Sequence, residues 1–230
     1  MPMCEAPWTA AARRRLGRNH CASLQGGVEP PQSKVLRTRG HAVEASTLIL
    51  AKAGYMDLRE QLATEIQGHV VVMGIGNPCR GDDAAGSLVA QQLSDLWHGH
   101  LGHDAPGVRV IDAQEVPENY LRQVVGEGPD TVVLIDSVDL KSAPGSVALL
   151  DKDQVAGYWP STHRVPLTLL MDYLERETHA RICLIAIQPR QTGFLQPMSA
   201  EVSSSVEGIA GVLNDVFEVA RCRRALESVL

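Results

Sequence analysis

Residues 70–83 read Val70-Val71-Val72-Met73-Gly74-Ile75-Gly76-Asn77-Pro78-Cys79-Arg80-Gly81-Asp82-Asp83. The first four residues form an uninterrupted β-favouring run, which is typical of a strand buried on both faces of a parallel sheet. After the glycine-rich loop, apolar residues recur at helical spacing in Ala85, Leu88, Val89, Leu93 and Leu96. A buried strand, a loop and an amphipathic helix in this order predict an α/β protein.

The alternation of strands and helices continues along the rest of the chain. Further strands are predicted over 108–112, 131–136, 147–150 and 181–187. Helices are predicted over 57–66, 117–125 and 166–177, and in a last stretch with one apolar face made of Val202, Val206, Ile209, Leu213, Val216 and Ala220. The order predicts a three-layer αβα sandwich with a mostly parallel, twisted sheet of about five strands. No helix separates 131–136 from 147–150, so these two strands are expected to pair antiparallel.

The composition is that of a globular protein, with 44% hydrophobic and 21% charged residues. No apolar run reaches the roughly 18–20 residues that a membrane span needs. The five cysteines are odd in number and scattered, and no two form a C-x-x-C pair. This pattern fits neither a disulfide framework nor a zinc ribbon, so a reducing cytoplasm is the expected location. We expect a monomer.

Charge divides the chain unevenly. Residues 1–40 hold seven basic and two acidic residues, a net +5, so the other 190 residues carry −11 of the total −6. An acidic body repels phosphate backbones, which argues against nucleic-acid binding.

The sequence predicts a domain over 56–230 that is preceded by an extension over 1–55. The extension has paired glycines, paired prolines and clustered arginines without an apolar period, so it is predicted to be disordered or not native to the protein. A twin-arginine signal would need an apolar region that is missing, and an organelle transit peptide remains an alternative. Translation starting near Met56 is another, since a good helix start follows that residue.

Carboxylates follow three of the predicted strands. Asp82 and Asp83 lie in the loop after the first strand, Asp112 ends the second and Asp136 ends the third. Ligands of open α/β sheets bind at the carboxyl ends of the strands, and carboxylates gathered there favour a cation. His163 precedes a helix, and it can add an imidazole. Two carboxylates and one imidazole suit Ni²⁺ or Zn²⁺, so Asp83, Asp136 and His163 are the best candidate ligands.

Each of these residues also has a simpler interpretation. A lone Asp at a strand end is usually a turn or capping residue, as we predict for Asp139, and a lone His before a helix is usually a loop residue. A nucleotide loop is disfavoured because the third glycine is at 81 rather than 79 and Gly-Lys-Ser/Thr is absent. A cysteine nucleophile is disfavoured as well, since no basic triad partner of Cys79 is evident nearby in the sequence and Cys183 is expected in a core strand.

Taken in order, these blocks resemble the hydrogenase maturation endopeptidases, most closely the hydrogenase 3 type. That family carries G-x-G-N-x-x-x-x-D-D/E-x-x-G after a strand, an Asp at the second strand end, D-A/S-x-D with a later A-P-G, T-T-H-x-x-P-L, and I-Q-P followed by G-F-x-x-P-M. The matching residues are Gly74, Gly76, Asn77, Asp82, Asp83 and Gly86, then Asp112, Asp136 to Asp139, Ala143 to Gly145, Ser161 to Leu167, Ile187 to Pro189 and Gly193 to Met198.

The resemblance implies an endopeptidase that removes a C-terminal extension from the nickel-loaded precursor of a NiFe hydrogenase large subunit. It implies nickel recognition by Asp83, Asp136 and His163, with the nickel carried by the substrate and Zn²⁺ or Cd²⁺ able to substitute in vitro. For the activation of water, Asp82 and Asp112 are the neighbouring candidates.

Two positions depart from the family pattern, because Ala113-Gln114 replaces a glycine-containing pair and Ala84 replaces a frequent glycine. Gln114 is therefore expected to adopt a positive φ. These departures leave open a paralogue that binds the precursor or nickel without cutting. The runner-up family, the peptidyl-tRNA hydrolases, shares G-x-G-N-P but needs a T-R-H-N-x-G block and a basic face.

Overall fold

The computed structural model describes residues 57–101, 107–156 and 166–227, so the expectations for residues 1–55 lie outside the described part. The strands are β1 Val70–Ile75, β2 Val108–Gln114, β3 Thr131–Ser137, β4 Val147–Leu150 and β5 Arg181–Ile187. The helices are α1 Leu58–Glu65, η2 Gly81–Ala84, α2 Ala85–Leu101, η3 Pro117–Tyr120, α3 Leu121–Glu127, α4 Lys152–Val155, α5 Leu167–Thr178 and α6 Ala200–Glu227.

One sheet of five strands, in the order β2-β1-β3-β5-β4, forms the centre of the fold. The first four strands are parallel, and β4 is antiparallel to β5. Every residue of β1 and β3 is buried, which explains their uninterrupted apolar sequences. The predicted fold class, an α/β sandwich on a mostly parallel sheet, is confirmed.

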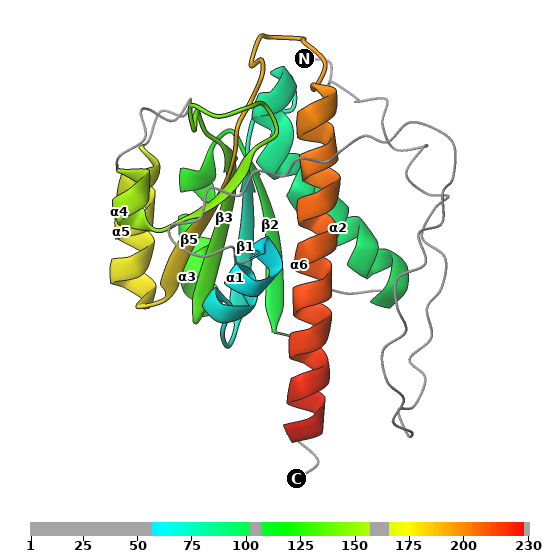
Figure 1. The fold of residues 1–230 in the computed structure, drawn as a ribbon. Coiled ribbons are helices and arrows are strands. Elements are labelled where there is room, and N and C mark those ends of the chain that lie inside the picture. The colour runs from blue at the N-terminus through cyan, green and yellow to red at the C-terminus, as the bar shows by residue number, and fades with distance from the viewer. Residues whose placement is uncertain (1–56, 102–106, 157–165, 228–230) are drawn as a thin grey trace, which may run out of the picture. The chain divides into compact units, whose positions relative to one another are not determined.

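Helices cover both faces of the sheet (Figure 1). Because side chains alternate along a strand, Val70 and Val72 of β1 pack into one core, with α1, α2 and α6. Val71 and Met73 pack into the other, with α3 and α5. Each such fully buried side chain contributes about 1.5–3 kcal/mol relative to exposure. The first strand thus stabilises both halves of the sandwich.

The pairing expected for 131–136 and 147–150 is wrong. β4 pairs with β5, with Val147 opposite Ile187, and β5 lies between β3 and β4. The connection after β3 crosses the end of β5, where the Val138 amide donates to the Ile187 carbonyl over 2.9 Å and the Gly145 amide donates to the Gln188 carbonyl over 2.8 Å. These contacts hold the crossing chain in place, and they arise between segments about 50 residues apart, so local pattern does not reveal them.

Two helices start at prolines, as predicted. Pro166 precedes α5, and Pro117 begins the short 3₁₀ helix η3 that leads into α3. In α6 the predicted apolar residues from Val202 to Val216 are buried, whereas Ala220 is only half-buried. None of the described helices is long and apolar enough to cross a membrane.

Candidate functional site

The carboxyl ends of β1 and β3 bring two predicted site residues to the same edge of the sheet. Asp136 lies in β3 and is fully buried, while Asp83 lies in η2 and is 2% exposed. Ser137 contacts both residues: its amide donates to Asp136 Oδ1 over 2.7 Å, and its hydroxyl donates to Asp83 Oδ1 over 3.4 Å. The Asn77 amide lies 3.4 Å from Asp83 Oδ2. Two buried carboxylates thus approach one serine.

The third predicted ligand, His163, lies outside the described residues. Within the described ranges, no three His, Cys, Asp or Glu side chains are grouped so that they could hold a metal ion. The described part of the site therefore consists of a carboxylate pair.

Asp82 has different surroundings from its neighbour Asp83. It is fully buried, and four donors surround its carboxylate. Oδ2 accepts from the amides of Arg190 and Gln191 over 2.8 and 3.0 Å and from the Ser199 hydroxyl over 2.9 Å. Oδ1 accepts from the Ser199 amide over 2.6 Å. A carboxylate has about four acceptor positions, so this arrangement uses the capacity of Asp82 to fix the 190–199 segment.

Asp112 is also engaged by protein donors. Its Oδ1 accepts from the Ser87 hydroxyl over 2.7 Å and from the Gln114 amide over 3.2 Å, and its Oδ2 accepts from Gln91 Nε2 over 2.8 Å. Gln114 has a φ of 51°, so the expected positive φ is confirmed. In this conformation the Gln114 carbonyl accepts from the Gly76 amide over 2.8 Å. Asp112 therefore joins α2 to the end of β2 and to the glycine loop.

The glycines of the loop serve close packing. A Cβ on Gly86 would lie 2.0 Å from the Ile135 carbonyl oxygen and 2.3 Å from that of Ile75. A Cβ on Gly74 would lie 2.1 Å from the Gly86 carbonyl oxygen. Only glycines allow α2 to approach the strand ends this closely, which accounts for the motif without a bound nucleotide.

The loop itself is held by side chains that the sequence pattern did not single out for this role. The Cys79 amide donates to Asn77 Oδ1 over 2.9 Å, and Asn77 Nδ2 donates to Glu115 over 2.5 Å. Ser199 on Asp82 and Ser137 between the carboxylates were not assigned roles either. Ser137 lay inside a quoted motif, whereas Ser199 carries no sequence signal, because it acts on a residue 117 positions away.

The cysteines of the described part give no support to a thiol mechanism. Cys183 is buried in β5, as predicted, and this burial raises the pKa of its thiol to about 12. The thiol therefore stays protonated near neutral pH. Cys79 is half-buried, and its carbonyl accepts a hydrogen bond from the Leu195 amide over 2.7 Å.

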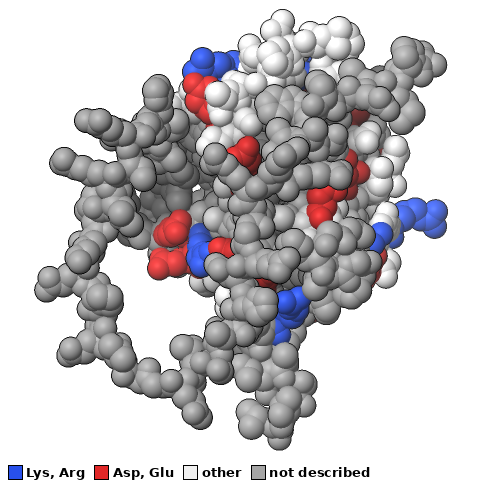
Figure 2. Space-filling view, turned by 90° about the vertical axis from the view of Figure 1, so that its right-hand side faces the viewer, with Lys and Arg blue, Asp and Glu red and all other residues white. Residues whose placement is uncertain are grey.

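Asp139 is confirmed as a turn residue. Its carboxylate accepts from the Lys141 amide over 3.1 Å and pairs with the Lys141 ammonium group, and these bonds lower the pKa of Asp139. Among the described residues on the face drawn in Figure 2, acidic and basic side chains are interspersed without one continuous basic patch.

The comparisons with known proteins agree with this architecture. The sequence model of one family, described as hydrogenase maturation protease (HycI), matches residues 100–215. The hydrogenase 3 maturation protease of Escherichia coli K12 is 30% identical over 140 residues, which are 60% of this chain and 85% of that protein. The matched family segment contains Asp112 and Asp136, and it begins after Asp82 and Asp83.

Two solved structures are similar as well. The crystal structure of the NiFe hydrogenase maturation protease HycI from Thermococcus kodakarensis is 31% identical, with a TM-score of 0.62, and it covers 69% of this chain and 99% of its own. The solution structure of the endopeptidase HycI from Escherichia coli is 28% identical, with a TM-score of 0.54, and covers 62% and 86%. The peptidyl-tRNA hydrolase alternative is thereby set aside. The chain belongs to the hydrogenase maturation proteases, a family of peptide-bond hydrolases.

Proposed function

We propose that this protein removes a C-terminal extension from the nickel-loaded precursor of a NiFe hydrogenase large subunit. The observation that carries the proposal is the pair of buried carboxylates, Asp83 and Asp136, which come from different strand ends and share contacts with Ser137. Two buried carboxylates that contact the same residue favour a cation, because a cation offsets their mutual repulsion. The precursor's nickel is such a cation, and it belongs to the substrate.

In this proposal Asp83, Asp136 and His163 recognise the nickel. Carboxylate oxygens and an imidazole nitrogen form a donor set that suits a borderline divalent ion, and Zn²⁺ or Cd²⁺ would bind the same donors. Metal recognition restricts the enzyme to precursors that have received their nickel. Cutting then follows insertion of the metal.

Asp82 and Asp112 take positioning roles in this proposal. Three main-chain amides and a hydroxyl donate to Asp82, and one main-chain amide and two side chains donate to Asp112. A proton acceptor needs a lone pair directed at the reacting water, and Asp82 has four protein donors around it. We therefore expect these two residues to maintain the loop geometry, and not to exchange protons with substrate.

The test is cleavage of a nickel-loaded large-subunit precursor, followed as a loss of mass by mass spectrometry. Wild type should release the tail from the nickel-loaded precursor and leave the metal-free precursor intact. Asp136→Asn and His163→Ala should each lower the cleavage rate by at least about 100-fold, since misplacing a reacting group by 1 Å can cost that much.

The matched control for Asp136→Asn is Asp139→Asn, the same change three residues further on at an exposed turn. This control should cleave like wild type. Cleavage that ignores nickel, or Asp136→Asn activity equal to that of the control, would contradict the proposal. Tight binding of the precursor by wild type without any cleavage would instead identify a paralogue that only binds.

A further inference from the structure

The segment between β5 and α6 carries an unusual pair of exposed side chains, which we call the apolar tip: Phe194 and Leu195. Each is 66% exposed, more than any other large apolar side chain of the described residues. Apolar side chains that are two-thirds exposed contribute little to folding by burial. An exposed apolar pair of this kind is typical of binding surfaces.

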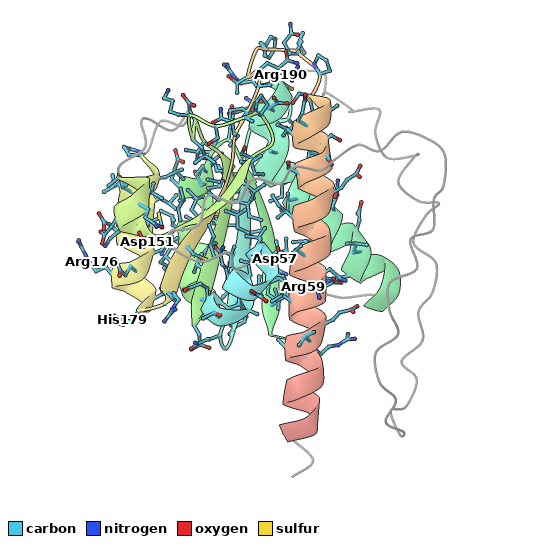
Figure 3. All side chains as sticks on the ribbon, viewed as in Figure 1. Asp57, Arg59, Asp151, Arg176, His179 and Arg190 are labelled. Atoms are coloured by element: carbon cyan, nitrogen blue, oxygen red, sulfur yellow. The ribbon has the colours of Figure 1, made fainter. Side chains whose placement is uncertain are left out.

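The segment is nevertheless firmly fixed to the rest of the fold. Asp82 binds both of its ends through Arg190, Gln191 and Ser199, as described above. Across the loop, Gln191 Nε2 donates to the Pro197 carbonyl over 2.8 Å. In Figure 3, Arg190 lies near the N-terminal ends of α2 and α6, at the opposite end of the molecule from His179. The tip is therefore a fixed part of the fold, at the end of the sheet that carries the candidate site.

The backbone at the tip is strained at an exposed leucine. Leu195 has a φ of 57°, a left-handed conformation that leucine rarely adopts. Glycine or asparagine would adopt this conformation at lower cost. Folding alone gives no reason for leucine at this position, and strain of this kind is concentrated at functional sites.

The tip directly adjoins the candidate site. The Leu195 amide donates to the Cys79 carbonyl over 2.7 Å, which joins the tip to the turn that leads into Asp82 and Asp83. A polypeptide bound over the glycine loop would therefore lie beside the tip.

The apolar tip and the adjoining edge of the candidate site together match one kind of partner. No charged residue occurs between Arg190 and Glu201, so the stretch around the tip is uncharged. The adjoining site edge carries the buried carboxylates of Asp83 and Asp136 and the carboxylate of Glu115, which accepts from Asn77 of the glycine loop. A partner that matches both surfaces presents an apolar side chain next to a cationic centre.

We propose that the apolar tip is the docking surface for an apolar segment of the hydrogenase large-subunit precursor that flanks the nickel. This inference rests on the proposed function, and it adds a second point of contact that the carboxylates do not supply. The acidic pair recognises the cation, and the tip binds the neighbouring polypeptide. Electrostatic attraction to the cation and burial of apolar surface at the tip then each contribute part of the affinity for the substrate.

The experiment uses the full chain with Phe194→Ser and Leu195→Asn combined. Asparagine tolerates the left-handed backbone, and both side chains are exposed, so the variant should unfold at the wild-type temperature or above. The control is Val219→Ser, a residue of α6 that is 58% exposed and lies about 28 Å along the helix from Ala200, at 1.5 Å per residue. Thermal melts verify the fold of every variant.

Two readouts separate the docking surface from the proposed function. In cleavage kinetics with nickel-loaded precursor, the double variant should raise KM by at least about tenfold with kcat nearly unchanged, and the control should match wild type. In biolayer interferometry, precursor binding should weaken by a similar factor in the double variant alone.

If wild type and the double variant have equal KM and equal affinity for the precursor, the docking proposal is wrong, whereas the proposed cleavage is unaffected. Wild type that binds through the tip but never cuts would overturn the proposed function and support the docking surface. Absence of binding by wild type would overturn both.

Discussion

Asp82 and Asp83 are adjacent in the chain, yet their side chains meet different neighbours. In a 3₁₀ helix such as η2, successive residues are turned by about 120°, so one carboxylate is directed toward the 190–199 segment and the other toward Ser137. The first is surrounded by amide and hydroxyl donors. The second contacts Ser137, which also binds Asp136, and the proposed nickel recognition depends on this arrangement.

Removing the acceptors of Asp82 should destabilise the protein. Asp82→Asn replaces one oxygen by an amide that donates, so at least one buried main-chain donor loses its partner, at a cost of about 1–3 kcal/mol for each. We expect the free energy of unfolding in urea to fall by about 2–4 kcal/mol.

Asp139→Asn is the matched control for this change, because Asp139 is exposed and asparagine can still accept from the Lys141 amide. The free energy of unfolding of Asp139→Asn should fall by less than about 1 kcal/mol. Equal unfolding free energies for the two variants would show that the hydrogen bonds of Asp82 do not stabilise the fold.

Among the elements, α2 is the one that positions the site. Its first turn packs directly on the ends of β1 and β3 through Gly86, and the same end carries Ser87 and Gln91, which bind Asp112. A side chain at position 86 would push the helix away from both strands. The carboxylate pair depends on this contact, because Asp83 directly precedes the helix in η2.

Gly86→Ala should therefore be strongly destabilising. The added Cβ would meet two main-chain oxygens within 2.3 Å, and main chain in the centre of a sheet cannot rotate away. We expect a loss of at least about 3 kcal/mol in the free energy of unfolding, as for severe overpacking. Circular dichroism during urea titration measures it.

Gly208→Ala provides the opposite control within α6, since a Cβ there has no neighbour within 4 Å. This substitution should stabilise the protein by about 0.5–1 kcal/mol through helix propensity. A Gly86→Ala variant as stable as wild type would mean that α2 does not need the close approach.

At the scale of the whole molecule, the buried thiol of Cys183 gives global stability a dependence on pH. Burial raises its pKa from 9.0 to about 12, so between these values the folded protein keeps a proton that the unfolded chain releases. Rising pH in this window therefore favours unfolding. Cys183→Ala should lose about 1 kcal/mol less stability than wild type between pH 8 and pH 10, measured by urea unfolding. Parallel curves for the two proteins would contradict this assignment.

The sequence predicted the fold well where the signal is local. The apolar runs of β1, β3 and β5 identified the parallel strands, and the missing glycine at 114 predicted a positive φ that the structure has. The position of β4 was wrong because pairing is decided by a chain crossing over β5. The approach of Asp83 and Asp136 to one edge of the sheet was predictable, because both residues lie at the carboxyl ends of strands. The surroundings of Asp82 were not, because main-chain amides look alike in any sequence.

The contacts of Asp82 also determine when, during translation, this part of the fold can form. Its donors at 190–199 are made 108 to 117 residues later, and β5, which separates β3 from β4, is made late as well. A ribosome that has released only the first half of the domain has delivered a carboxylate without donors and a sheet without its fourth parallel strand. The loop that carries Asp82 and Asp83 therefore gains the donors of Asp82 only after residues 190–199 have been synthesised.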